Sequence, residues 1–219
     1  MRSVKAVAAF LLFLILGFGA SSSAENVVEV PIIAAFLSKD NSPINDRGVF
    51  EVMLVWWDQK TDPNQVELRW SNAIVNYRQV HLDAMADAFA YALERTPSVR
   101  HSGTVTAKGI SYKPMSSDGP SAGAVMAVGF IAVLKGDRLQ RGIALTGTIE
   151  SGGRIGPVGR IPDKVRAAAR EGYHTVLIPS GQLHDPKWNL SGLAIELNVA
   201  IKEVSTVDEA YELMTGQRI

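Results

Sequence analysis

A serine and a lysine are the residues of this chain whose types and surroundings predict chemistry. Ser121 stands in the run Asp-Gly-Pro-Ser-Ala-Gly at residues 118–123, and Lys164 falls in a later segment with helical spacing. A serine hydroxyl is a poor nucleophile at its own pKa and needs a neighbouring base, and lysine is a known alternative to histidine in that role. The pair therefore predicts nucleophilic catalysis by a Ser-Lys dyad.

The lysine shares the apolar face of the helix predicted over residues 162–171. That face runs through Ile161, Val165, Ala168 and Ala169, whereas Asp163, Arg166 and Arg170 point the other way. An amine in an apolar site has its pKa lowered from about 10.4 toward neutrality, so its neutral form can accept a proton. Alternatively, Lys164 lays its stem along the edge of the stripe and keeps its ammonium in water. Periodicity does not decide between the two.

The serine also has a structural alternative. Ser121 precedes a predicted helix, and serine is a favoured N-cap, a task that Ser116 and Asp118 are near enough to share. The same position sets the serine oxygen beside backbone N–H groups at the positive end of a helix, where an oxyanion is stabilised. One geometry therefore serves capping and catalysis alike.

The run also fits the Gly-x-Ser-x-Gly elbow of α/β-hydrolases, which use a Ser-His pair. That elbow needs a buried strand leading directly into the turn, but residues 112–118 are polar and contain Pro114. Only His174 and His184 follow the serine, and neither has an evident orienting partner. The Ser-His alternative is therefore disfavoured.

Composition narrows the function classes. The chain has 219 residues, 47% hydrophobic, which is enough for one substantial core. Lys plus Arg and Asp plus Glu each total 22, so no net charge draws it toward nucleic acid. Cysteine is absent, which excludes thiol catalysis, zinc-thiolate sites and disulfides. We expect a protein with neither a cofactor nor a metal.

The N-terminus predicts export. Arg2 and Lys5 precede an uncharged apolar run at about residues 6–20, and the small residues Ser22 and Ala24 follow it. This is the pattern of a signal peptide cleaved after Ala24, leaving residues 25–219 as the mature chain. The alternative is an uncleaved membrane anchor. Either way the folded part is expected outside the cytoplasm, in the periplasm or the medium.

The pattern of the remaining chain predicts alternating strands and helices. Strands are expected at residues 27–36, 48–57, 103–112, 141–149 and 175–178, and helices at about 71–95, 122–134, 162–171 and 207–216. The helix at 122–134 has no charged residue, so it should be buried on nearly every side. Gly152, Gly153 and Gly156 indicate a flexible connection before the lysine helix.

These residues resemble the proteolytic domain of Lon proteases. The run at 118–123 is similar to that family's nucleophile motif, and the interval from Ser121 to Lys164 is similar to its serine-to-lysine interval. The run Leu145-Thr146-Gly147 and the segment 167–179, ending in Thr-Val-Leu-Ile-Pro, also resemble the family. The resemblance is strong over residues 104–219 and limited over 25–100 to the order of strands and one helix.

The resemblance implies a single α/β (α+β) domain of Lon type, with twisted sheets and flanking helices. It implies that Ser121 is the nucleophile, that Lys164 is the general base and that Thr146 orients the dyad. The loop Asp118, Gly119 and Pro120 would shape the nucleophile site, with a backbone oxyanion hole. The family further implies a polypeptide substrate and ring-like self-association.

The chain departs from the family at several points. Thr148 replaces an acidic residue, and Ala107 and Gly109 stand near positions where many members have histidines. No Gly-x-x-x-x-Gly-Lys-Ser/Thr phosphate loop occurs, so we expect no ATP binding by this chain. The sequence thus predicts an exported, ATP-independent serine endopeptidase that cleaves unfolded or flexible polypeptides. The alternative is a non-catalytic Lon-like module that binds peptides or assembles with partners.

Overall fold

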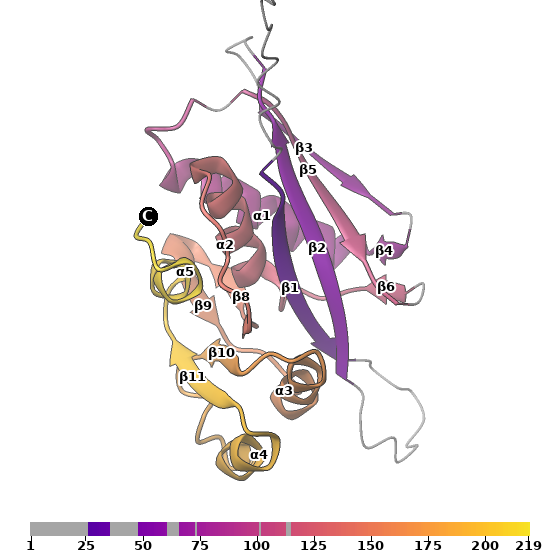
Figure 1. The fold of residues 1–219 in the computed structure, drawn as a ribbon, viewed down its shortest axis with the longest axis vertical. Helices are drawn as coiled ribbons and strands as arrows, with labels where there is room; N and C mark the ends of the chain where they lie inside the picture. The colour runs from indigo at the N-terminus through magenta and orange to yellow at the C-terminus, as the bar shows by residue number, and fades with distance from the viewer. Residues whose placement is uncertain (1–25, 36–47, 61–65, 73, 101, 113–114) are drawn as a thin grey trace, which may run out of the picture.

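A seven-stranded mixed sheet organises the molecule (Figure 1). The computed structural model describes residues 26–35, 48–60, 66–72, 74–100, 102–112 and 115–219. The strand order is β11-β10-β7-β1-β2-β5-β3, and two small sheets pair β4 with β6 and β8 with β9. The predicted signal peptide at residues 1–24 lies outside the described residues. No helix within the described ranges is long and apolar enough to cross a membrane.

The strands of the main sheet come from both halves of the chain. Their bounds are Val28–Ala35 (β1), Gly48–Asp58 (β2), Val66–Ser71 (β3), Gly103–Ile110 (β5), Ile143–Leu145 (β7), Thr175–Pro179 (β10) and Ala200–Val204 (β11). β1, β2 and β5 pair antiparallel, whereas β7, β10 and β11 continue the sheet in parallel from β1. β1 therefore pairs antiparallel with β2 on one side and parallel with β7 on the other, and the edge strand β3 pairs in parallel with β5.

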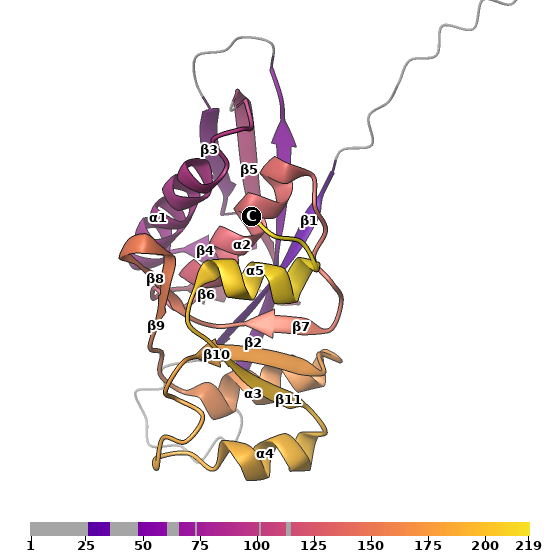
Figure 2. The same cartoon turned by 90° about the vertical axis from the view of Figure 1, so that its left-hand side faces the viewer.

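Within the described residues, five helices cover both faces of this sheet. They are α1 (Gln79–Arg95), α2 (Gly123–Lys135), α3 (Ile161–Arg170), α4 (Leu190–Leu197) and α5 (Val207–Thr215). Ile32 belongs to the core cluster that includes residues of α1, α2 and α5, whereas its neighbour Ile33 belongs to the cluster that includes residues of α3 and α4. Successive strand residues point to opposite faces, so the helices form two outer layers around the sheet. Figure 2 shows α4 and α5 on opposite sides of β10 and β11.

Helix α2 is the buried centre of the fold, as its uncharged sequence predicts. Every residue from Gly123 to Leu134 is buried, and Gly136 ends the helix in the left-handed conformation. Phe130 of α2 meets Phe89 of α1 edge-on at 5.3 Å between ring centroids. At Gly129 the helix lies so close to β1 that a Cβ there would come within 2.3 Å of Val30 Cγ2.

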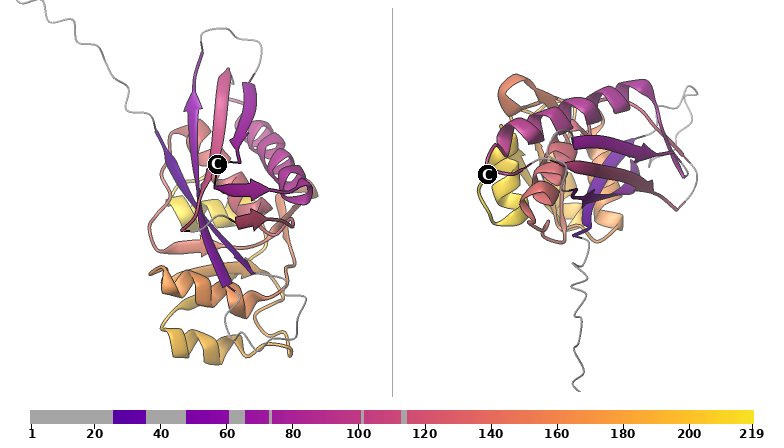
Figure 3. Two further views of the ribbon diagram at one scale, coloured as in Figure 1. Left: turned by 90° about the vertical axis from the view of Figure 1, so that its right-hand side faces the viewer. Right: turned by 90° about the horizontal axis from the view of Figure 1, so that it is seen from above.

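One predicted helix begins later than its sequence suggests. The helix expected from about residue 71 starts at Gln79, and the residues before it form the short strand β4 (Val75–Tyr77). β4 pairs in parallel with β6 (Met115–Ser117), and both lie next to α1 (Figure 3). The apolar residues before Gln79 are buried in a strand rather than in a helix: Val75 and Tyr77 are buried, while Asn76 between them is exposed.

The strand expected at 141–149 is divided, because Thr146 and Gly147 leave the sheet between β7 and β8 (Thr148–Glu150). The glycine-rich connection is not a loop but the end of a hairpin in which β8 pairs with β9 (Arg154–Gly156). Gly152 and Gly153, in the short 3-10 turn Ser151–Gly153, both have positive φ, which explains glycine at the hairpin tip. The patterns did not predict β3, α4 or β11.

Replacing Gly129 with alanine tests the close approach of α2 to β1. Alanine favours a helix over glycine by about 1 kcal/mol, but its methyl group would overlap Val30. We expect Gly129→Ala to lower the free energy of unfolding by about 1 to 2 kcal/mol in urea titrations. In a Val30→Ala background the same change should be neutral or stabilising. Equal effects in both backgrounds would contradict the packing described here.

Candidate active site

Ser121 lies in a turn between β6 and α2 and does not cap the helix. The helix starts at Gly123, the N-cap position is held by Ala122, and no side chain caps it. The Ser121 hydroxyl forms no hydrogen bond with any described residue, and the side chain is half-buried. The capping alternative is therefore wrong, and the hydroxyl has no structural partner that would compete with a reaction.

The backbone of Ser121 is fastened to the segment that follows β7. Its carbonyl oxygen accepts hydrogen bonds from Gly147 N at 2.9 Å and from Thr146 Oγ1 at 3.2 Å. Ala124 N donates to Gly147 O at 3.0 Å, which ties the first turn of α2 to the same segment. A Cβ at Gly147 would lie 2.3 Å from Ile155 Cγ2, so this close approach requires glycine.

Lys164 is buried in the first turn of α3. Only 4% of the residue is exposed, and its neighbours Ile161 and Val165 are fully buried. Its Nζ donates a hydrogen bond to Thr146 Oγ1 at 2.9 Å. The sequence left open whether the amine reaches water along the edge of the helix, and that alternative is wrong.

Burial changes the acid-base behaviour of this amine. Loss of hydration disfavours the ammonium form and lowers the pKa of Lys164 from 10.5 to about 8. Roughly a tenth of the molecules then carry a neutral amine at pH 7, against about one in three thousand for an exposed lysine. Lys164 can therefore act as a base near neutral pH.

Thr146 joins the two predicted catalytic residues. Its hydroxyl accepts from Lys164 Nζ and donates to the Ser121 carbonyl, so the amine is one hydroxyl away from the serine residue. No hydrogen bond joins Ser121 Oγ to Lys164 Nζ among the described residues. Direct proton transfer thus requires the Ser121 side chain to turn toward the amine, a tightening that is common when substrate binds.

The three residues before the serine shape the loop. Asp118 Oδ1 accepts from Gly119 N at 2.8 Å, and Pro120 O accepts from Gly123 N at 3.0 Å. Gly119 has φ of +91°, a conformation that favours glycine. Within the described chain the N–H groups of Ser121 and Ala122 have no partner, so they are available as donors to an oxyanion.

The described part of the chain does not contain the nucleophile elbow of an α/β-hydrolase, which is the alternative for the Gly-x-Ser-x-Gly run. The strand before the loop, β6, has three residues and belongs to a small two-stranded sheet rather than to the buried main sheet. His174 bonds instead to Thr175 Oγ1 at 3.0 Å, and among the described residues no histidine hydrogen-bonds to Ser121. A Ser-His pair is therefore not formed.

A buried polar cluster beside the loop was missed by the sequence analysis. It consists of Glu51, Tyr77, His81 and Ser117, each at most 4% exposed. A signal for it was present, because Glu51 alternates with the apolar Met53 and Val55 on the inward face of β2. Gly109, which stands near a position where many family members are expected to have histidine, has no room for a side chain: a Cβ there would lie 2.4 Å from Tyr77 Oη.

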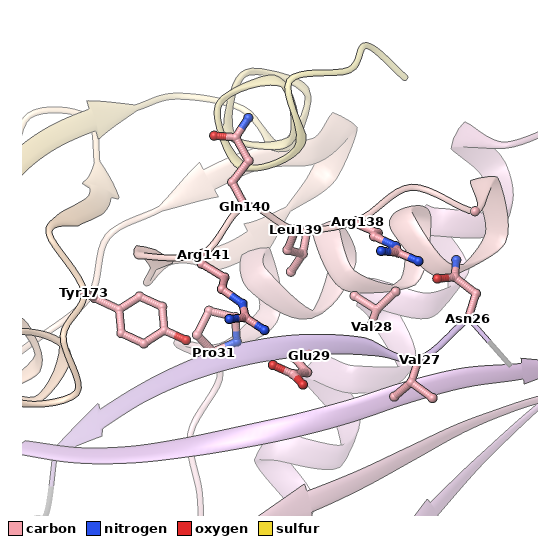
Figure 4. Close-up of a pocket in the computed structure, with 11 residues that line it drawn as sticks. Asn26, Val27, Val28, Glu29, Pro31, Arg138, Leu139, Gln140, Arg141 and Tyr173 are labelled. Carbon is pink, nitrogen blue, oxygen red and sulfur yellow. The ribbon is translucent and has the colours of Figure 1, made fainter. Parts of the chain in front are cut away.

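A cavity of about 600 Å³ lies apart from these residues (Figure 4). It is lined by the start of β1 and by the loop after α2, with Arg141 lying between Tyr173 and Glu29, and Arg138 near Asn26. None of the predicted site residues lines it. The candidate active site is therefore defined by the serine loop and the buried amine, not by this cavity.

Within a mixed α/β fold, the Ser121 loop and the buried Lys164 amine are linked through Thr146 and supply the two groups that Ser-Lys chemistry needs. Comparison with known proteins gives the family. Residues 112–215 match the Lon protease (S16) C-terminal proteolytic domain, which confirms the resemblance over that part of the chain. The mixed α/β fold agrees with a proteolytic domain of this family.

Individual relatives match a little under half of the chain. The Lon protease of Haemophilus influenzae is 38% identical over 92 residues, which is 42% of this chain and 11% of that protein. The Lon protease of Desulforamulus reducens is 37% identical over 98 residues, 44% of this chain and 12% of that protein. The chain therefore spans about a tenth of the length of these relatives.

The burial of Lys164 predicts a stability cost that a neutral side chain removes. The cost is present in full below pH 8 and disappears as pH rises from 8 to 10.5, because the unfolded lysine then also loses its proton. We expect Lys164→Met to raise the free energy of unfolding at pH 7 by about 3 kcal/mol, and by little above pH 10.5. Urea titrations at several pH values measure this, with exposed Lys202→Met as control. A lower stability of Lys164→Met at pH 7 would contradict the assignment.

Proposed function

We propose that this chain is an exported, ATP-independent serine endopeptidase that uses Ser121 as nucleophile and Lys164 as general base. The observation that carries the proposal is the buried Lys164 amine, held by Thr146 one hydroxyl away from Ser121. Membership of residues 112–215 in the Lon proteolytic domain family supports the same reaction class.

The reaction follows from these positions. The neutral Lys164 amine accepts the Ser121 hydroxyl proton as Ser121 Oγ attacks the peptide carbonyl carbon. The resulting oxyanion receives hydrogen bonds from the backbone N–H groups at the start of α2, whose positive end adds to the stabilisation. The ammonium then returns its proton to the leaving amine, and an acyl-enzyme remains on Ser121. A water activated by Lys164 hydrolyses the acyl-enzyme.

Thr146 acts in this scheme as a positioning residue. It holds the amine of Lys164 from one side and the carbonyl of Ser121 from the other. A lysine stem has four rotatable bonds, so fixing its end reduces the entropy that must be lost before proton transfer. The neighbouring Thr148, which takes the place of an acidic residue, is half-buried in the β8–β9 hairpin.

The proposed substrate class rests on the missing phosphate loop. The chain contains no phosphate loop of the Gly-x-x-x-x-Gly-Lys-Ser/Thr type to power unfolding. An enzyme without such a motor cleaves chains that are already extended, so we propose unfolded or flexible polypeptides as substrates. The basic and apolar N-terminal segment supports export, with cleavage after Ala24 or retention as an anchor. Family membership supports assembly into a ring.

Casein digestion without nucleotide tests the proposed function. We expect the wild-type chain to cleave casein, and Ser121→Ala and Lys164→Ala each to reduce the rate by at least a thousandfold. Ser116→Ala and Lys202→Ala, which change exposed residues of the same types, serve as controls. Cleavage that persists in Ser121→Ala or Lys164→Ala would refute the dyad. A folded wild-type chain without any activity would instead favour the non-catalytic binding module.

The same assay at different pH values tests the role of the amine. Because the base must be neutral, the wild-type rate should rise from pH 6 to pH 8 as Lys164 loses its proton. Initial rates on a short fluorogenic peptide avoid changes in casein structure. A rate that is constant from pH 5 to pH 9 would contradict general base catalysis by Lys164.

A further inference from the structure

Four polar side chains meet in the buried layer between β2 and α1. Glu51 comes from β2, Tyr77 from β4, His81 from α1 and Ser117 from β6. Their exposed fractions are 1%, 3%, 1% and 4%, so no member reaches the solvent appreciably. They form a single cluster because Tyr77 contacts Glu51 and stacks on His81, which in turn contacts Ser117.

The contacts inside this cluster are specific. Tyr77 Oη donates to Glu51 Oε1 at 2.9 Å, and its ring stacks on the His81 ring at 4.7 Å with an interplanar angle of 1°. Ser117 Oγ lies 3.3 Å from His81 Nδ1. The absence of a side chain at Gly109 provides the space that the Tyr77 hydroxyl occupies.

The cluster is not fully satisfied. Glu51 Oε2 and His81 Nε2 are buried and have no hydrogen-bond partner in the described part of the chain. An unpaired buried polar atom costs about 1 to 3 kcal/mol, and apolar residues of similar size would avoid that cost. Packing alone therefore does not account for a carboxyl and an imidazole at these positions.

Ser117 connects the cluster to the nucleophile loop. It is the last residue of β6, and Asp118 begins the loop that carries Ser121. Its carbonyl accepts from Arg78 N at 3.0 Å, and it is the register partner of Tyr77 in the β4–β6 pair. The pairing of β4 with β6 holds the backbone of Ser117 at the start of the loop, and the contact with His81 holds its side chain.

We infer that Glu51, Tyr77, His81 and Ser117 form a positioning network that holds the nucleophile loop in its reactive arrangement, and that the proton of Glu51 controls this network. The inference rests on the proposed function of Ser121. None of the four residues is assigned a contact with substrate, and they act through the loop.

The chemistry of one hydroxyl makes the network sensitive to ionisation. The Ser117 hydroxyl has a single proton, which it can donate to His81 Nδ1 or to the Glu51 carboxylate, but not to both. While Glu51 is neutral, it does not compete strongly for this proton, and Ser117 can donate to the imidazole. When Glu51 ionises, the buried carboxylate competes for the Ser117 proton and the link to His81 is lost.

The titratable groups around Glu51 support this order of events. Burial raises the pKa of Glu51 to about 7, against the opposing influence of the Tyr77 and Ser117 hydroxyls. Burial lowers the pKa of His81 to about 4, although Asp118 in the loop favours its charged form. From α1, β4 and the loop, the groups that face the cluster are therefore His81, Tyr77 and Asp118. Near neutral pH, Glu51 is the member that titrates.

Ser117→Ala tests the link to the loop. We expect it to lower kcat on a short fluorogenic peptide tenfold to a hundredfold with KM within twofold, and to slow covalent labelling of Ser121 by a fluorophosphonate probe by the same factor. Ser102→Ala is the matched control, because Ser102 is equally buried and bonds to the Lys60 carbonyl away from the loop. If both variants change kcat equally, or if Ser117→Ala leaves it within twofold, the positioning role is refuted.

Glu51→Gln tests the role of the proton and does not depend on Ser117→Ala being folded. Glutamine keeps an oxygen for Tyr77 but cannot ionise. The ratio of variant to wild-type kcat cancels the titration of Lys164, which both proteins share. We expect this ratio to rise at least threefold from pH 6 to pH 9, because only the wild type loses its network as Glu51 ionises. A ratio that stays constant over that range would overturn the inference.

Failure of this inference is distinguishable from failure of the proposed function. If the wild type neither cleaves the peptide nor reacts with the probe at Ser121, the peptidase proposal itself fails and the network has no reaction to support. If the wild type is active and Ser121→Ala is not, while the Ser117 and Glu51 variants behave like the wild type, only the positioning network is refuted.

Discussion

The exclusion of water from one amine is the interaction on which the site depends. Lys164 is 4% exposed, and this burial lowers its pKa to about 8. One hydrogen bond to Thr146 offsets only part of the free-energy cost of removing the ammonium group from water. We expect a lysine in this position to make the protein less stable than a methionine would, and a pKa of about 8 leaves part of the amine neutral at a pH where an exposed lysine is almost fully protonated. Such an exchange of stability for reactivity is typical of functional sites.

The amine and the serine are positioned by helices on opposite faces of the sheet, since Lys164 lies in α3 and Ser121 just before α2. α3 covers the face with Ile33, and α2 covers the opposite face with Ile32. Where β7 ends, Thr146 and Gly147 leave the sheet and bond to Ser121 just before α2, and Thr146 also accepts a hydrogen bond from Lys164 of α3. Glycine at 147 permits a contact that any side chain would block. The Ser121 loop is fixed from its other side by β6 and Ser117.

The sequence predicts most of this arrangement, and its errors have physical causes. The uncharged stretch before Lys135 predicts a buried helix because no other environment suits it, and the structure agrees. Periodicity leaves open whether Lys164 reaches water, because the helical spacing does not distinguish a residue at the centre of the apolar face from one at its edge. The Glu51 cluster is missed because its members come from four separate elements, and nothing local in the chain reports their contact. The strand β4 is missed because its pairing partner lies forty residues away in β6.

Titration of Lys164 itself tests the central claim most directly. Lysine labelled with ¹³C at the ε position gives one NMR signal for each residue, and comparison with Lys164→Ala assigns the signal of interest. The account predicts that this signal titrates with a midpoint near pH 8, because burial lowers the pKa of the amine. A midpoint near the ordinary value of 10.5 would show that the amine remains hydrated, and it would contradict the assignment of Lys164 as the base.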